Sequence, residues 1–259
     1  MQSQIIFLGT AGDSFVLAKQ QRIAGGILIQ TQGMQFHCNP GPGAFVAAQQ
    51  YATVRETTAV IVTDNSFVHS HDAPAIVDAM TLGGFDAKGL LLVSKSALPV
   101  FSQKYQNAVE KVVVLQEEAK IECNAVQIEA VKIKNKDPDT VGVKITTPEF
   151  SLGYLGKTRY SPRINESVKD VEILILELTS ILESKEGLCV AEAQQLIQEI
   201  KPQLAVLTGF GIDVLKEDIL ELTRRMCRAT GQQIIAAKDG FSFDPTSYAV
   251  KLRQQRLQF

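Results

Sequence analysis

Short apolar runs separated by turn residues dominate the first part of the chain. They have the length and the Ile, Leu and Val content of strands, and they lie at residues 4–9, 26–31, 34–38 and 59–62. A Gln-Gly turn between the second and third runs predicts a hairpin. A short helix is expected at about residues 44–51, after a rigid Asn-Pro-Gly-Pro-Gly turn.

Strand and helix patterns alternate more evenly in the rest of the chain. Strands are expected at residues 89–94, 112–115, 125–134, 141–145, 150–155, 171–178, 204–207 and 233–237, and helices at 72–80, 190–200 and 214–229. A strand-rich part followed by a mixed part favours an α/β (α+β) sandwich of two mixed sheets with outer helices. No stretch has the composition and length of a linker, so we expect a single domain over residues 1–259.

The junction after the apolar run at residues 59–62 is the first candidate site. The run breaks into polar residues at Thr63, and Asp72 is the expected N-cap of the helix that follows. Ligands of α/β sheets bind in such strand–loop–helix junctions, because the loop lies beyond the carboxyl end of the strand. Two of the three histidines, His69 and His71, lie in this loop.

Composition narrows the class of protein further. The chain is 45% hydrophobic and 21% charged with a net charge of −2, which gives no general attraction for nucleic acid or membranes. No window approaches the ~20 apolar residues of a membrane span. The start of the chain does not read as a signal peptide and the four cysteines are far apart, so we expect a cytoplasmic protein with reduced thiols.

A series of motifs runs in order along nearly the whole chain. They are Phe7-Leu-Gly-Thr, Arg22-Ile-Ala-Gly-Gly, Asn39-Pro-Gly-Pro-Gly, Asp72-Ala-Pro, Asp137-Pro-Asp, Gly153-Tyr-Leu-Gly-Lys and Leu207-Thr-Gly-Phe-Gly. In this order they resemble the metallo-β-lactamase-fold hydrolases, and more closely an archaeal-type subgroup. The resemblance implies a four-layer αββα sandwich. Asn39 stands where the family usually has aspartate.

The resemblance also implies where the family's metal ligands would fall. The family's signature is Thr/Ser-His-x-His-x-Asp-His, followed by three later ligands. In this chain the seven ligand positions are Asp64, Ser66, Val68, His69, Asn135, Lys157 and Gly209. Only His69 keeps the family's residue type. Valine and glycine offer no donor, serine and asparagine are poor zinc ligands, and a lysine ammonium repels metal ions.

These residues predict a metal-free protein with no cofactor, a pseudoenzyme that acts in binding, scaffolding or regulation. Its contact site would be the vestigial cleft that the seven positions form. The alternative is a metal-dependent hydrolase, similar to phosphodiesterases, nucleases or lactonases, with a rearranged site for zinc or another divalent transition metal. Val68, Lys157 and Gly209 favour the first interpretation.

Other residues could supply chemistry near this cleft. A mononuclear zinc site could be rebuilt from His37, His69, His71 and Asp72. Ser66 or Cys189 could act as a nucleophile, although capping and packing explain both residues more simply. Asp64 and Lys157 could also form an ion pair that keeps the shape of the cleft without metal.

The sequence leaves the partners open. A protein partner, a small anionic ligand and a homodimer all fit, whereas a membrane does not. Lys132, Lys134 and Lys136 alternate along one strand and could form a basic rim for phosphate or nucleic acid. No RNA-binding motif accompanies them, so a solvated strand face is the simpler interpretation. Residues 251–259 predict an amphipathic tail.

Overall fold

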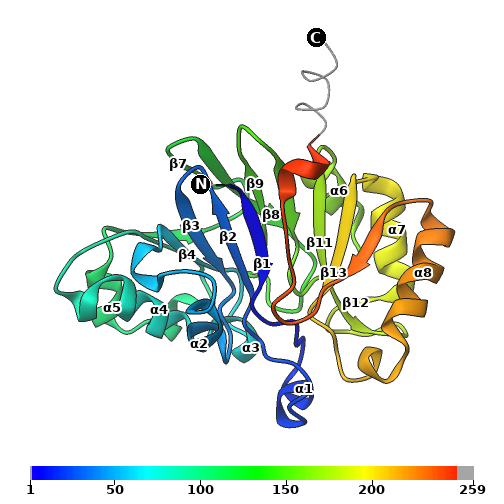
Figure 1. Ribbon diagram of the computed structural model, residues 1–259, viewed down its shortest axis with the longest axis horizontal. Coiled ribbons are helices and arrows are strands. Elements are labelled where there is room, and N and C mark those ends of the chain that lie inside the picture. Colours follow the sequence, from blue (N-terminus) through cyan, green and yellow to red (C-terminus); the bar gives the residue numbers. More distant parts are fainter. Residues whose placement is uncertain (1, 250–259) are drawn as a thin grey trace. The chain divides into compact units, whose positions relative to one another are not determined.

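Two mixed sheets, each accompanied by helices, make up the computed structural model, which describes residues 2–249 (Figure 1). Each sheet belongs to one of two compact units. The first unit comprises residues up to Gln116 together with Asp139–Val141 and Lys238–Phe243. The second unit comprises Glu117–Pro138, Gly142–Ala237 and, at the end of the described chain, residues 244–249. The sequence-predicted tail at residues 251–259 lies outside the described part of the chain.

The first unit contains a seven-stranded sheet. Its spatial order is β15 (Ser242–Phe243), β1 (Gln4–Phe7), β2 (Ile27–Thr31), β3 (Met34–Cys38), β4 (Ala59–Val62), β5 (Leu90–Ser94) and β6 (Lys111–Leu115). Strands β15, β1, β2 and β3 pair antiparallel, and β3 to β6 pair parallel. The carboxyl ends of β3 and β4 are therefore neighbours, which places Asn39 beside Thr63.

Short helices follow the strands of the first unit. They are α1 (Ser14–Ala18), α2 (Ala44–Ala48), α3 (Phe67–Ser70), α4 (Ala73–Met80) and α5 (Gln103–Ala108). Apolar side chains of α2 and α4, such as Ala48, Ile76 and Met80, pack with Val60 and Leu91 of the sheet in one buried cluster. This packing fixes the α3–α4 corner against the ends of the parallel strands.

The second unit contains an eight-stranded sheet. Its main path is β14 (Ile234–Ala236), β13 (Leu204–Thr208), β11 (Ile173–Ser180), β10 (Ser151–Tyr154), β9 (Val141–Thr146), β8 (Val126–Lys132) and β7 (Lys120–Cys123), and β12 (Leu188–Cys189) pairs with β11. Strands β10, β11, β13 and β14 are parallel neighbours. The helices of this unit are α6 (Pro162–Val168), α7 (Val190–Ile200) and α8 (Ile219–Thr230), and Leu196 and Met226 bury apolar side chains with Leu174 and Leu207.

The two mixed sheets confirm the α/β class that the hydrophobic pattern predicted. The predicted hairpin and the predicted strands are all present within one or two residues of their expected ends. The predicted helix at 214–229 is wrong in its first part, because residues 214–216 form a separate 3-10 turn and α8 begins after Asp218. The single-domain expectation stays a prediction. Within residues 2–249, no helix has both the length and the apolar content that crossing a bilayer requires.

Candidate functional site

Asn39 and Thr63 lock together the ends of two neighbouring parallel strands in the first unit. The Asn39 side-chain amide donates to Thr63 Oγ1 at 2.7 Å, and its Oδ1 accepts from the Thr63 backbone N at 2.8 Å. Both residues are fully buried. These two hydrogen bonds fix the point at which the chain leaves β4 and enters the candidate loop.

Asp64 and His69 form a buried pair directly after this lock. His69 Nδ1 donates to Asp64 Oδ2 at 2.6 Å, and the two residues are 3% and 4% exposed respectively. Asp64 also accepts from the Ser66 backbone N at 2.8 Å and from Thr63 Oγ1 at 3.3 Å. The sequence-predicted residues Asp64 and His69 are thus brought together, and each serves as a hydrogen-bond partner of the other.

Ser66 and Val68 lie between the two members of the pair, where helix α3 begins. The Ser66 carbonyl accepts from the His69 backbone N at 2.9 Å and from Ser70 Oγ at 2.9 Å. Val68 is buried, and its backbone carbonyl lies against Gly41: a Cβ built on Gly41 would be 1.9 Å from that oxygen. Glycine is therefore required at position 41, where the turn after β3 touches α3.

Asp72 occupies the predicted N-cap position of α4, but its side chain does not cap that helix. Its Oδ2 accepts instead from the backbone N of Gly43 at 3.0 Å and of Phe45 at 3.1 Å, at the start of α2. The predicted capping of α4 by this carboxylate is wrong, because the carboxylate accepts instead from two backbone N–H groups at the start of α2, where a helix leaves its first N–H groups without partners inside the helix. The anion bound at the glycine-rich turn is thus the carboxylate of Asp72.

His37 and His71 have surroundings unlike those of His69. His37 lies on β3, fully buried, with its Nε2 3.5 Å from the Gln35 side-chain amide. Burial lowers the pKa of His37 from 6.5 to about 4, so the imidazole is neutral at pH 7. His71 is exposed and its ring lies 4.4 Å from that of Phe67. Within residues 2–249, no three His, Cys, Asp or Glu side chains are grouped so that they could hold a metal ion.

Asn135 and Lys157 meet in the second unit. The Asn135 side-chain amide donates to the Lys157 backbone carbonyl at 2.6 Å, and its Oδ1 accepts from the Asp137 backbone N at 3.0 Å. Asn135 therefore acts as a clamp between two loop segments. Its amide is committed to the backbone, as is common for asparagine in loops.

A buried glutamate fills the space beside Gly209. Glu177 on β11 is 3% exposed, and its Oε1 accepts from the Tyr154 hydroxyl at 2.6 Å. Gly209 follows β13 with a φ of +55°, and a Cβ built there would lie 2.4 Å from Glu177 Cγ. Tyr154, Glu177 and Gly209 thus mark the carboxyl ends of three parallel strands, which is the edge where α/β sheets bind ligands.

Tyr154 and Glu177 were not among the predicted site residues. One signal was present: Glu177 interrupts an otherwise apolar run at residues 173–178. A carboxylate inside a fully buried strand requires a hydrogen-bond partner, and here the Tyr154 hydroxyl is one such partner. The partner comes from a strand about twenty residues away, which the sequence pattern does not identify.

The residues predicted at the family's ligand positions do not have the chemistry of a two-metal centre. They include one imidazole, His69, and one carboxylate, Asp64, which are already bonded to each other. Val68 and Gly209 have no donor atom, and Lys157 brings a positive charge. The side chains of these seven residues therefore lack the three or four protein ligands that each zinc ion usually has.

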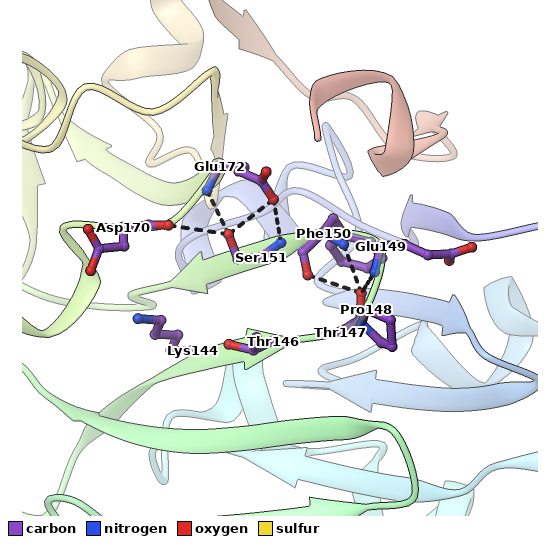
Figure 2. A pocket seen from close by; sticks show the side chains of 9 residues that line it. All are labelled: Lys144, Thr146, Thr147, Pro148, Glu149, Phe150, Ser151, Asp170 and Glu172. Atoms are coloured by element: carbon purple, nitrogen blue, oxygen red, sulfur yellow. Dashed lines mark hydrogen bonds between the residues drawn. The ribbon is translucent and has the colours of Figure 1, made fainter. Parts of the chain in front are cut away.

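A separate pocket of about 420 Å³ lies at the turn between β9 and β10 of the second unit. Figure 2 shows its polar groups bonded to one another: Ser151 and Glu172 exchange three hydrogen bonds, and Thr147 Oγ1 accepts from the backbone of the turn. The Thr147 bonds close the turn between β9 and β10, and the Ser151–Glu172 bonds join the start of β10 to the residue before β11. The pocket is at the amino end of β11, opposite to the edge that carries Glu177.

Two of the three lysines of the predicted basic rim form surface ion pairs. Lys132 pairs with Glu117 at 2.5 Å, and Lys136 pairs with Glu186 at 3.1 Å. Each exposed pair offsets the charge of its lysine, which weakens the attraction of these two positions for polyanions.

Comparison with protein families identifies the class of this chain. Residues 35–210 match the family model described as the beta-lactamase superfamily domain. The matched segment begins on β3 and ends just after β13, so it includes the Asp64–His69 pair and Gly209. The chain therefore belongs to the beta-lactamase superfamily, and the predicted family is confirmed.

Individual relatives are similar over nearly the full length of the chain. The uncharacterized protein MJ1374 of Methanocaldococcus jannaschii is 28% identical over 256 residues, covering 94% of this chain and 96% of its own. The metallo-β-lactamase-fold protein YhfI from Bacillus subtilis matches with a TM-score of 0.79 at 15% identity, covering 94% of this chain and 99% of its own. A diphosphatase of the PhnP family matches with a TM-score of 0.71 at 14% identity, covering 93% and 97%.

These similarities confirm the metallo-β-lactamase-like fold. At 14–15% identity, structural likeness establishes the fold and leaves the activity open. Other solved structures similar to this chain are described as a metallo hydrolase and as a tRNase Z, and the predicted pseudoenzyme is not confirmed by these comparisons.

Proposed function

We propose that this chain is a binding or regulatory protein of the beta-lactamase superfamily that does not use the family's two-metal hydrolysis. The observation that carries the proposal is the 2.6 Å bond between His69 and Asp64. Both side chains stand at predicted ligand positions, yet they are buried and bonded to each other, with Asp64 in the loop after β4 and His69 on α3. Such a pair is suited to hold a fixed hydrogen-bonding surface.

The proposed ligand is a small anion. Lys157 places an ammonium at a position where the family carries a bridging carboxylate, and an ammonium attracts anions and repels metal dications. Asn135 fixes the backbone of Lys157 through its carbonyl, so the position of this lysine is set by the fold. Asp64, Ser66, Val68 and His69 remain proposed contact residues of the first unit, and Asn135, Lys157 and Gly209 remain proposed contact residues of the second unit.

The second candidate function is a metal-dependent hydrolase of phosphodiesters or lactones with a rearranged metal site. The specific observation in its favour is the likeness in fold to a diphosphatase of the PhnP family. In that case Asp64 and His69 would have to exchange their mutual bond for bonds to zinc or another divalent transition metal. Hydrolysis would then depend on water activated by that metal.

Metal content distinguishes the two functions. We expect untagged protein to contain under about a tenth of an equivalent of transition metal by plasma mass spectrometry, since a metal site needs a defined ligand set. After incubation with zinc, manganese or iron and removal of free metal, the content should stay at that level. Phosphodiester and lactone substrates should then be hydrolysed no faster than in buffer.

Two variants make this measurement specific. His69→Ala removes the retained family ligand, and His71→Ala removes an exposed histidine two residues away as a matched control. One or two equivalents of metal in the wild type and in His71→Ala, lost in His69→Ala together with hydrolysis, would contradict the proposal and establish the hydrolase. Circular dichroism of each variant verifies that the fold is retained.

A further inference from the structure

Asp72 lies next to α4 in the sequence, but its carboxylate is hydrogen-bonded to the start of α2. Asp72 directly precedes α4, whereas Oδ2 accepts from Gly43 N and Phe45 N at the start of α2. An anion at that place is favoured by the unpaired N–H groups and the dipole of the helix. The Asp72 backbone N donates to the Pro40 carbonyl at 3.1 Å. Asp72 therefore binds both ends of the turn between β3 and α2.

The same turn touches both ends of the segment that carries the Asp64–His69 pair. At one end, Asn39 holds Thr63 through two hydrogen bonds. At the other end, Gly41 lies against the Val68 carbonyl so closely that no Cβ fits between them. The turn thus acts as a spacer between the residue before Asp64 and the residue before His69.

We infer that Asp72 is a positioning residue, which sets the geometry of the Asp64–His69 pair through this turn. If the turn shifts away from Val68, α3 gains freedom, and the 2.6 Å bond between Nδ1 and Oδ2 is no longer imposed. Asp72 does not touch either member of the pair through its carboxylate. Its effect passes through packed backbone, which transmits small displacements because interiors are close-packed.

This inference rests on the proposed role of the Asp64–His69 pair, but it is tested without any ligand. The readout is the Nδ1 proton of His69, observed by NMR in the metal-free full chain and assigned by its loss in His69→Gln. A hydrogen bond to a buried carboxylate protects this proton from exchange with water. Its exchange rate therefore reports the opening of the pair.

Asp72→Ala should accelerate this exchange by about tenfold, the effect expected from losing a cap that serves two N–H donors. Asp72→Asn should keep most of the protection, because the asparagine Oδ1 can accept from the same two donors. The exchange should still be about threefold faster than in the wild type, since charge-assisted hydrogen bonds are stronger than neutral ones. Asp78→Ala is the control on the same helix. Asp78 pairs with Lys104 at 2.9 Å on the surface, and its loss should leave the exchange unchanged.

Three outcomes would overturn the inference. The first is unchanged exchange in Asp72→Ala with a lowered melting temperature, which would make Asp72 a purely structural cap. The second is equal acceleration in Asp78→Ala, and the third is the absence of a protected Nδ1 proton in the wild type. If Asp72→Ala does not fold, the comparison of wild type with Asp72→Asn decides. A failed ligand or metal measurement would contradict the proposed function and leave this result intact.

Discussion

His37 shows how a single buried side chain makes the stability of the folded state depend on pH. Its ring is enclosed on β3, and burial lowers its pKa to about 4. In the unfolded chain the same imidazole has an ordinary pKa near 6.5. The unfolded state therefore takes up a proton first as the pH falls, and the folded state loses stability between about pH 6.5 and pH 4.

His37→Gln should remove this loss. The lowered pKa of His37 should reduce the free energy of unfolding of the wild type by about 3 kcal/mol between pH 6.5 and pH 4. This contribution should be absent in the variant. Urea unfolding at pH 7 and pH 4.5 measures the difference. His71→Gln, at an exposed position, should keep the pH dependence of the wild type; the same pH dependence in His37→Gln would contradict the assignment.

Gly209 illustrates a steric requirement at one residue. Gly209→Ala should destabilise the protein by about 2–4 kcal/mol, because alanine disfavours positive φ and its Cβ would overlap Glu177. Gly231→Ala is a matched control, since Gly231 has a φ of +68° with no atom within 4 Å of a built Cβ. It should cost about 1 kcal/mol, the conformational part alone.

The role of Glu177 can be isolated by a double substitution. In a Glu177→Ala background, the cost of Gly209→Ala should fall part of the way towards that of Gly231→Ala. The overlapping Cγ and Cδ atoms are then gone, whereas the Cβ of residue 177, 2.7 Å from the Cβ built on Gly209, remains. Thermal melts and urea unfolding of the four proteins measure this coupling. Equal costs with and without Glu177 would show that overlap does not explain the glycine.

At the scale of elements, the predicted helix over residues 214–229 proves to be two elements. The apolar pattern continues through residues 214–216, but the chain turns there in a 3-10 helix and α8 starts afresh. Asp218 decides the boundary: its Oδ1 accepts from Leu220 N at 2.9 Å and Glu221 N at 3.0 Å. Periodicity alone missed this cap because hydrophobic spacing does not end where a helix ends.

Asp218→Ala should destabilise the second unit by about 1 kcal/mol, the usual cost of losing an N-cap. Urea unfolding followed by circular dichroism measures the change. Asp213→Ala serves as the control, because Asp213 forms only an exposed pair with Lys216 and should change stability by less than about 0.5 kcal/mol. Equal effects of the two substitutions would mean that the cap does not stabilise α8.

At the scale of the whole molecule, contacts distant in sequence close the first unit. Asp239 Oδ1 accepts from Thr10 N at 2.9 Å and Thr10 Oγ1 at 2.7 Å, and Oδ2 accepts from Ile23 N at 2.8 Å. One carboxylate thus holds both ends of the loop that carries α1. The segment with Asp239 also supplies β15, which extends the sheet at β1.

Asp239→Ala should loosen the loop between Thr10 and Ile23 without unfolding the sheet. Amide hydrogen exchange in that loop should accelerate by about tenfold or more, because three hydrogen bonds to one carboxylate are lost. Mass spectrometry of peptic fragments measures the change. Asp244→Ala, which removes a cap local to residues 244–246, should leave the loop unaffected.

The sequence by itself determined the class of fold and most of its elements. Alternation and apolar runs depend on neighbouring residues, so they predicted the strands of both sheets and helices such as 190–200. The order of motifs identified the family. Short segments with weak local signals, including α1, α6 and β7, were missed because packing stabilises them more than their own propensity.

Only the tertiary structure decided the partners of the polar side chains. The sequence selected Asp64, His69 and Asp72, but not that the first two bond to each other and the third caps α2. It likewise gave no reason why Glu177 occupies the space beside Gly209. A hydrogen bond depends on distance and direction in space, and residues far apart in the chain meet only when the sheets have formed.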